Sequence, residues 1–180
     1  MHPQSSFSCH GTRVPDQTRS ADDSIFRMPR WICILLITGI ACYAAELPTK
    51  HYLDLNTIKS MVAAAEAEAV KRNVHVSICI VDESGNLLFF EKADGAPLNT
   101  IQFAQKKARH AAFYGSPSKN GMDAAAAGKL DVLAFPDFFP NQGGLPIKVD
   151  GQLIGGISAS GAKSEIDEAV AQAGLDVLTK

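Results

Sequence analysis

The sequence has little cysteine, and most of it lies in one place. Cys9, Cys33 and Cys42 fall within the first 42 residues, so Cys79 is alone in the rest of the chain. A lone cysteine excludes an internal disulfide there, and an oxidising compartment is tolerated without covalent staples. No basic residue adjoins Cys79 in its apolar stretch, so we expect a small buried side chain rather than a reactive thiol.

The sequence also lacks a large excess of either positive or negative charge. The chain has 17 Lys and Arg residues and 19 Asp and Glu residues, with a formal net charge of −2. Four of the basic and three of the acidic residues lie in residues 1–45, which leaves the remainder slightly acidic. Nucleic-acid-binding domains carry a strongly basic footprint, so this composition argues against nucleic acid as a partner.

Long hydrophobic runs are missing except for residues 31–41. The basic stretch from Met28 to Arg30 precedes this run and small residues follow it, as in a secretory signal peptide over residues 28–45. The run is shorter than the ~20 apolar residues of a membrane helix, so we expect no stable span after cleavage at Ala44 or Ala45. This pattern predicts a periplasmic or secreted protein.

Residues 1–27 are polar and lack periodicity. Signal peptides begin at the N-terminus, so Met28 is the expected start and residues 1–27 a mis-started or disordered leader. The alternatives are a genuinely long leader and an uncleaved anchor. Lipidation at Cys42 is a further alternative, although Gly39 stands where a Leu usually precedes a lipidated cysteine.

The remaining residues, 50–180, have the periodicity of one domain. Apolar residues at helical spacing predict helices at about 55–72, 99–114 and 165–178, with a short Ala-rich helix at about 122–130. Asp54 and Ser164 are the expected N-caps of the first and last helices. The predicted buried face of the first helix comprises Ile58, Met61, Val62, Ala65, Ala69 and Val70.

Four strands are predicted as two hairpins. The first joins residues 74–81 to 87–91 through a turn at 82–86, and the second joins 145–149 to 152–158 through Asp150-Gly151, a two-residue turn signal. The order is therefore α-β-β-α-(α)-β-β-α. We expect an α/β fold of the α+β kind, in which helices cover one antiparallel sheet of four or five strands.

Five motifs in this order resemble one family. They are residues 81–88, Asp94-Gly95-Ala96, Lys107-Ala108, residues 143–147 and residues 154–161. Together they are similar to the GlcG/HbpS family, the small haem-binding domain also found at the C-terminus of PduO-type proteins. The likeness covers about residues 53–178.

The resemblance implies a profilin-like fold, a homo-oligomer, and haem and iron binding in secreted members. A member of this kind senses redox stress with a two-component partner, so a signalling partner is also implied. Haem degradation belongs to the family name, and we do not carry it over as an established reaction. Many members have Lys-Ala-x-Thr-Ala in the second long helix, where this chain has His110 in place of Thr.

That departure makes His110 the candidate ligand of a haem iron, because imidazole is a common axial ligand. Lys106 and Tyr114 share its helix face at i−4 and i+4. Lys106 or Arg109 is expected to pair with a propionate, and Tyr114 to act as a second ligand or a hydrogen-bond partner. Phe135, Phe138 and Phe139 are candidates for an apolar wall.

The structural alternative is that His110 only complements the helix dipole, that the phenylalanines are core or subunit contacts, and that Lys106 and Arg109 are solvated. His51 and His75 lack partners at metal-ligand spacing, so we expect structural roles for them. The acidic pairs Glu66 with Glu68 and Asp167 with Glu168 resemble iron-binding patches, but such pairs usually only solvate a helix.

The glycine pairs 143–144 and 155–156 lack the context of a phosphate loop, so close approach of the backbone is the expected reason for them. Ser158, Ser160 and Gly161 precede the last helix, whose N-terminus is a candidate site for a carboxylate.

The leading hypothesis is a periplasmic or secreted haem-binding protein with roles in haem or iron binding, sensing or storage. The sequence has no catalytic triad, no paired acid and base and no cofactor loop, so no catalytic residue is assigned. One alternative is an enzyme or sensor acting on a small organic acid such as glycolate. The other is an oligomeric interaction module with a vestigial pocket.

Overall fold

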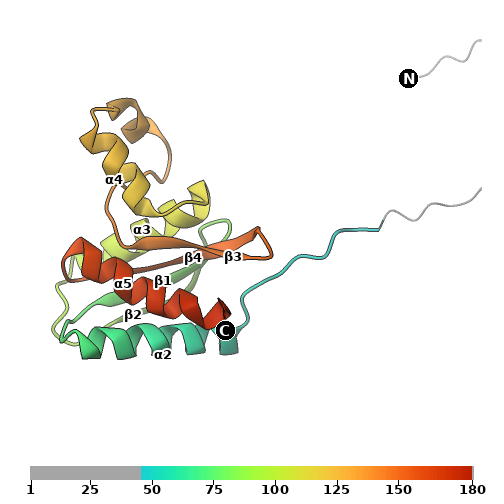
Figure 1. Cartoon of the computed structure of the whole chain (residues 1–180), viewed down its shortest axis with the longest axis horizontal. Coiled ribbons are helices and arrows are strands. Elements are labelled where there is room, and N and C mark those ends of the chain that lie inside the picture. Colours follow the sequence, from blue (N-terminus) through green and yellow to red (C-terminus); the bar gives the residue numbers. More distant parts are fainter. Residues whose placement is uncertain (1–45, 180) are drawn as a thin grey trace, which may run out of the picture. The chain divides into compact units, whose positions relative to one another are not determined.

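The computed structural model describes residues 46–179, and the predicted leader and signal peptide lie outside the described residues. Figure 1 labels the elements along the chain. They are α2 (Leu55–Lys71), β1 (Ser77–Asp82), β2 (Leu87–Lys92), α3 (Thr100–Tyr114), α4 (Ser118–Ala126), η1 (Leu130–Ala134), β3 (Gly144–Val149), β4 (Gln152–Ser160), α5 (Ser164–Leu175) and η2 (Asp176–Thr179).

The two predicted hairpins share one antiparallel sheet in the order β2-β1-β4-β3. Asp150 and Gly151 join β3 to β4 with φ angles of 50° and 78°. Two consecutive positive φ angles are those of a type I′ turn, which matches the twist of the flanking strands. The predicted α+β fold with an antiparallel sheet is confirmed.

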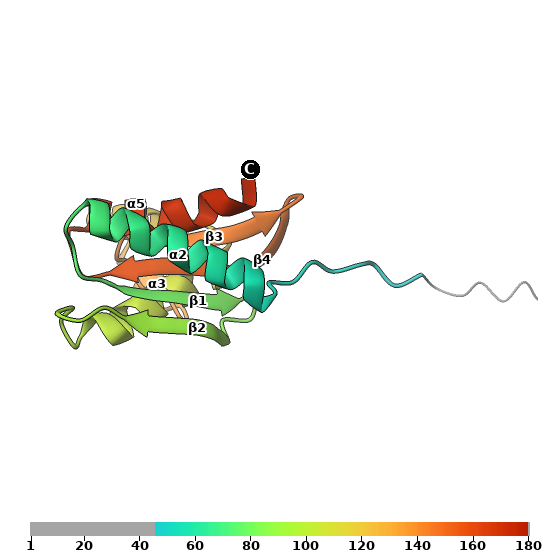
Figure 2. The ribbon, with the colours of Figure 1, turned by 90° about the horizontal axis from the view of Figure 1, so that it is seen from below.

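Helices cover both faces of the sheet (Figures 1 and 2). α2 and α5 lie on one face over the main hydrophobic core, and α3 lies on the other. β2 is an edge strand that pairs only with β1. The main core contains Ile58, Met61, Val62, Ala65, Val76, Ile78, Ile80, Ile147, Ile157 and Val170.

On the α3 face the backbones approach closely because the contacting residues are small. Ala104, Ala108 and Ala112 of α3 are fully buried there. A Cβ atom on Gly144 would lie 2.3 Å from the Lys107 carbonyl oxygen, and one on Gly156 would lie 2.4 Å from that of Ala108. Neither distance is possible for a real side chain, so the prediction of close backbone approach is confirmed.

Two predictions about α2 and α5 are wrong. Val70 is 79% exposed, because it follows Ala69 around the helix and points away from the buried stripe. The N-cap of α5 is Lys163, and no side chain caps the helix from that position. Asp167 in the first turn accepts the N–H of Ala162 at 2.9 Å, and this bond ties the chain before the helix to its first turn without capping the helix.

Several element boundaries also differ from the predictions, and two of these differences have a local cause. α4 begins at Ser118 rather than near residue 122, because Pro117 fixes a backbone geometry that suits entry into a helix. β1 begins at Ser77 rather than residue 74, because the preceding residues turn out of α2.

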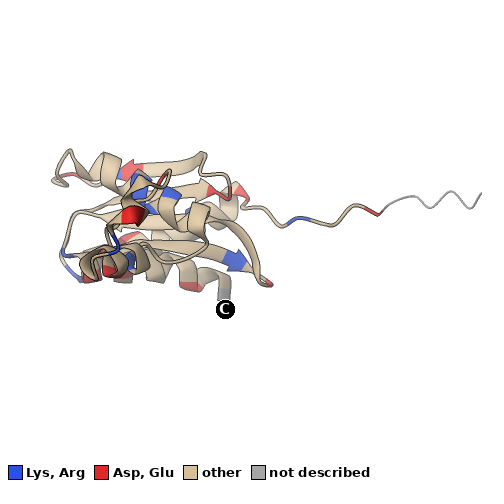
Figure 3. Ribbon diagram, turned by 90° about the horizontal axis from the view of Figure 1, so that it is seen from above, with Lys and Arg blue, Asp and Glu red and all other residues tan. Residues whose placement is uncertain are grey.

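Lys and Arg residues are interspersed with Asp and Glu residues over the described elements (Figure 3). Among residues 46–179, no helix has both the length and the apolar character needed to cross a membrane.

Candidate functional site

His110 lies on α3 and is buried, with 1% of its surface exposed. Its Nδ1 accepts a hydrogen bond of 2.9 Å from the Phe139 N–H. The rings of Tyr114 and Phe138 pack on the imidazole, each with a centroid distance of 4.9 Å. A Cβ on Gly121 would lie 2.9 Å from His110 Cε1, so α4 closes the remaining side.

This environment determines the protonation of His110. Burial lowers the pKa of the imidazole, which favours the neutral form. A neutral imidazole that accepts at Nδ1 carries its proton on Nε2. In this arrangement neither nitrogen offers a free lone pair to iron, so ligation by His110 requires loss of the hydrogen bond from Phe139.

The other three predicted site residues hold the same aromatic segment. Arg109 donates to both carboxylate oxygens of Asp137, at 2.8 and 3.1 Å, and to the carbonyl of Gly85. The Tyr114 hydroxyl donates to the Pro136 carbonyl. The Lys106 ammonium lies 5.6 Å from the centre of the Phe139 ring.

The structure therefore brings Lys106, Arg109, His110 and Tyr114 together as a clamp on residues 135–139, which we call the loop clamp. The hydrogen bond from Arg109 is the main cause of a lowered pKa at Asp137 and keeps that partner charged. Whether these residues also bind haem stays a prediction.

Lys107 points from the same helix into the protein. Its ammonium donates to Asp167 at 2.8 Å and to the Ala159 carbonyl at 3.2 Å, and both charged side chains are almost fully buried. Burial lowers the pKa of Lys107 and raises that of Asp167, while their mutual attraction acts in the opposite direction. The pair is thus a buried structural ion pair, in which the loss of either partner would leave the other charge buried and uncompensated.

A small polar cavity of about 230 Å³ adjoins this pair and is lined in part by Thr100, Asn141, Ser160 and Ser164. The predicted carboxylate site at the start of α5 is largely filled from within. Asp167 takes the Ala162 N–H, and the buried Ser158 hydroxyl donates to the Ala104 carbonyl at 2.6 Å.

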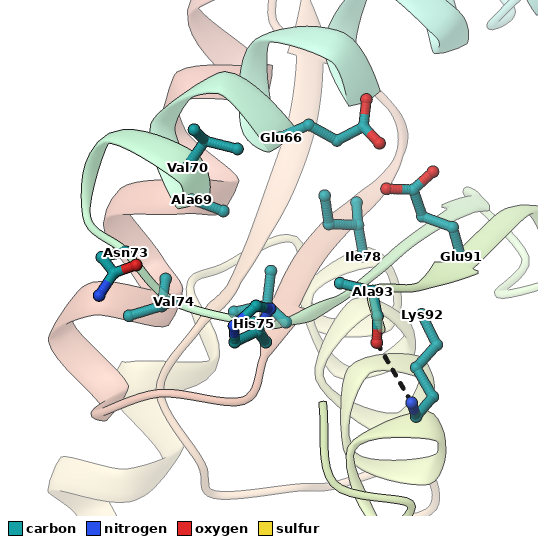
Figure 4. Close-up of a pocket in the computed structure, with 11 residues that line it drawn as sticks. Glu66, Ala69, Val70, Asn73, Val74, His75, Ile78, Glu91, Lys92 and Ala93 are labelled. Carbon is teal, nitrogen blue, oxygen red and sulfur yellow. Dashed lines mark hydrogen bonds between the residues drawn. The ribbon is translucent and has the colours of Figure 1, made fainter. Parts of the chain in front are cut away.

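An open cleft of about 420 Å³ lies between α2 and the β1–β2 hairpin (Figure 4). We call it the α2–β2 cleft. Most of its lining is apolar, and its charged residues come from α2, from the segment before β1 and from the end of β2. The lining comprises Glu66, Ala69, Val70, Asn73, Val74, His75, Val76, Ile78, Glu91, Lys92 and Ala93.

Three residues that line this cleft have nitrogen in their side chains, namely Asn73, His75 and Lys92. His75 is exposed, and its ring packs over Gly95, where an added Cβ would lie 3.6 Å from the imidazole Cγ. Within residues 46–179, the structure shows no hydrogen bond or ion pair to this imidazole. Lys92 makes a single hydrogen bond of 3.2 Å from its ammonium to the neighbouring Ala93 carbonyl.

Glu66 of α2 and Glu91 of β2 face each other within the cleft (Figure 4). Partial burial, together with the neighbouring Glu66 carboxyl, raises the pKa of Glu91 to about 7. Perturbed acids in clefts are frequent at functional sites.

The sequence analysis predicted a structural role for His75 and did not identify Lys92 or Glu91 as candidate site residues. Pairing of Ser77 with Lys92 and Ile78 with Glu91 places the end of β2 beside the start of β1. The predicted hairpin contained this signal, because His75 and Lys92 stand at its two open ends.

The comparisons with known proteins agree with this fold. The model of a family described as haem degrading protein, HbpS-like, matches residues 53–176. The chain belongs to the HbpS-like family.

Protein GlcG of Escherichia coli K12 is a relative of this HbpS-like chain, 33% identical over 114 residues that span 63% of this chain and 85% of GlcG. The crystal structure of an HbpS double mutant from Streptomyces reticuli has a TM-score of 0.68 and 30% identity, covering 77% of this chain and 95% of that one. The crystal structure of a PduOC–haem complex has a TM-score of 0.65 and 26% identity, covering 71% and 95%.

The membership confirms the predicted family and places haem-related binding among its relatives. Across residues 46–179, no three His, Cys, Asp or Glu side chains converge to hold a metal ion. A haem iron needs only one or two protein ligands. A single accessible histidine is therefore enough for this protein to hold a haem.

Proposed function

We propose that this HbpS-like protein binds haem in the α2–β2 cleft, where His75 would hold the iron. The observation that carries the proposal is an exposed imidazole, without a hydrogen-bond partner among the described residues, on an apolar cleft of about 420 Å³. The family match and the PduOC–haem relative support haem as the ligand.

The lining suits the three parts of a haem. Val74, Ile78 and Ala93 offer an apolar surface to the macrocycle. His75 offers a nitrogen to the iron, and the nearby Lys92 ammonium offers a charge to a propionate. When bound, haem would supply iron chemistry, while the residues of this chain hold and orient it.

The proposed role is binding, storage or sensing rather than catalysis, in the periplasm or outside the cell. A homo-oligomer and a signalling partner belong to the same proposal. The signal-peptide pattern of residues 28–45 supports the location, and the family resemblance supports the partners.

His110 is the second candidate ligand, with Lys106, Arg109 and Tyr114 around it. This assignment requires the loop clamp to open, because the Phe139 N–H occupies Nδ1. The required opening breaks several interactions, so the closed arrangement favours His75.

A haemin titration tests the proposal and separates the two histidines. We expect a Soret band in the purified protein, and a loss of affinity of at least about tenfold, which corresponds to about 1.4 kcal/mol, in His75→Ala, because this variant lacks the proposed ligand. His51→Ala is the matched control, because His51 is also exposed but lies outside the cleft lining.

The outcomes are distinct. An unchanged band in His75→Ala together with a lost band in His110→Ala would transfer the site to the loop clamp. No band in the wild-type protein would overturn haem binding altogether.

A second candidate function is binding of a small organic acid such as glycolate. The polar cavity of about 230 Å³ beside Lys107 favours it, although Asp167 already neutralises that cation. A thermal-shift screen of short hydroxy acids tests it, since a binder must raise the unfolding temperature. A defined oligomer with no response to acids or haemin would instead indicate an interaction module with a vestigial pocket.

A further inference from the structure

We propose that Glu66 and Glu91 make ligand binding in the α2–β2 cleft proton-linked, so that an anionic ligand enters together with a proton. This inference rests on the proposed function of the cleft. In this proposal the two glutamates determine how the affinity of the cleft depends on pH and on the charge of the ligand.

The geometry comes from two separate elements. Glu66 lies on α2 and Glu91 on the edge strand β2, and their carboxyl groups point toward each other in the cleft (Figure 4). Among the described residues neither carboxyl has a Lys, Arg or His partner within ion-pair distance. Glu68, two residues from Glu66 on the same helix, is by contrast paired with Lys71 and Arg72.

The other residues with titratable side chains that line the cleft are His75, from the segment before β1, and Lys92, from β2. Lys92 directs its ammonium to the Ala93 carbonyl. The cleft is therefore mostly apolar, with two like charges opposed and no countercharge bound directly to either.

Opposed carboxyl groups of this kind hold a proton near neutral pH. Burial and the proximity of Glu66 raise the pKa of Glu91 to about 7, because a second negative charge beside the first is disfavoured. Near pH 7 the Glu91 carboxyl therefore changes between its protonated and its ionised form.

A ligand with propionate groups adds negative charge to the same cleft. It favours the protonated pair, so binding takes up a proton and affinity falls as pH rises through about 7.

Haemin affinity measured between pH 6 and pH 9 tests the inference. We expect the affinity of the wild-type protein to fall above pH 7, with a limiting slope of about tenfold per pH unit for one proton. Glu91→Gln removes the titrating group while keeping the shape, so its affinity stays level above pH 7. Glu66→Gln should also flatten the profile, because it removes the charge that holds the proton on Glu91.

Glu68→Gln is the matched control, since it changes the same residue type on the same helix outside the cleft lining, and it should keep the wild-type slope. If the wild-type protein binds haemin through His75 but Glu91→Gln retains the wild-type slope, the inference is overturned and the proposed function stands. If no haemin binds in the cleft, both fall together.

Discussion

His110 and His75, two of the histidines among residues 46–179, are opposite in character. On the α3 side, His110 is buried beneath residues 135–139 and its Nδ1 is occupied by a backbone N–H. On the α2 side, His75 is exposed on an open cleft. The same side chain is part of the framework in one place and available for chemistry in the other, so access and hydrogen bonding decide its role.

The physical cause lies in residue size and coverage. α3 meets β3 and β4 through alanines and glycines, which bring the backbones into direct contact along this part of the helix. α2 lies over the sheet near β1, while β2 stands at the edge, and the cleft opens between them. Val70 is exposed beside this opening.

Replacing Lys107 with Met should test how tightly the α3 side is built. The substitution leaves the buried Asp167 carboxylate without its partner, and we expect a loss of about 3–5 kcal/mol in the free energy of unfolding. Chemical denaturation measures it. Lys106→Met, one residue away and exposed, should stay within about 0.5 kcal/mol, and equal losses in both variants would contradict the contrast.

His110→Ala against His75→Ala tests the two histidines directly. We expect His110→Ala to lower the free energy of unfolding by about 2–3 kcal/mol, because it creates a cavity and removes the acceptor of the Phe139 N–H. His75→Ala should change it by less than about 0.5 kcal/mol. Limited proteolysis should cut residues 135–139 faster in His110→Ala only, and a stable His110→Ala variant would refute the framework role.

Asp137→Asn should weaken the loop clamp at its exposed end. The Arg109 and Asp137 side chains are 41% and 28% exposed, so we expect a loss of about 0.2–1 kcal/mol. The difference from wild type should shrink as salt is raised, since exposed ion pairs are screened. A loss that is independent of salt would show that the pair acts through packing instead.

The pH dependence of the free energy of unfolding should test the raised pKa of Glu91 on the α2 side. Glu91 binds its proton up to about pH 7 in the folded protein, against an ordinary value of 4.5. The folded state therefore holds more protons than the unfolded state in this window, and its contribution to stability declines as pH rises from about 4.5 to about 7. Glu91→Gln should remove this decline in denaturation curves, whereas Glu68→Gln should retain it.

Much of the fold was predictable because its signals are local. Residues close together in the sequence determine both the apolar stripe of α2, from Ile58 to Ala69, and the Asp150-Gly151 turn. The start of α4 and the position of Val70 were predicted wrongly, since Pro117 and the width of the buried stripe only become informative in three dimensions.

The candidate site was predictable in part. Helical spacing predicted that Lys106, His110 and Tyr114 share one face of α3, and the structure adds that the rings of Tyr114 and Phe138 pack on His110. The direction of the Phe139 hydrogen bond depends on how residues 135–139 fold back over α3, which no spacing encodes. The cleft likewise depends on residues from both ends of a hairpin and from a helix.

The close contact of Gly144 and Gly156 with α3 means that the two sides of the sheet differ in how well they tolerate substitution. At those two positions even one added carbon atom would force the helix off the sheet. The α2–β2 cleft has no such restriction, because its walls end in side chains rather than in backbone. New ligand specificity can therefore be introduced at the edge strand while the opposite side of the sheet keeps the frame constant.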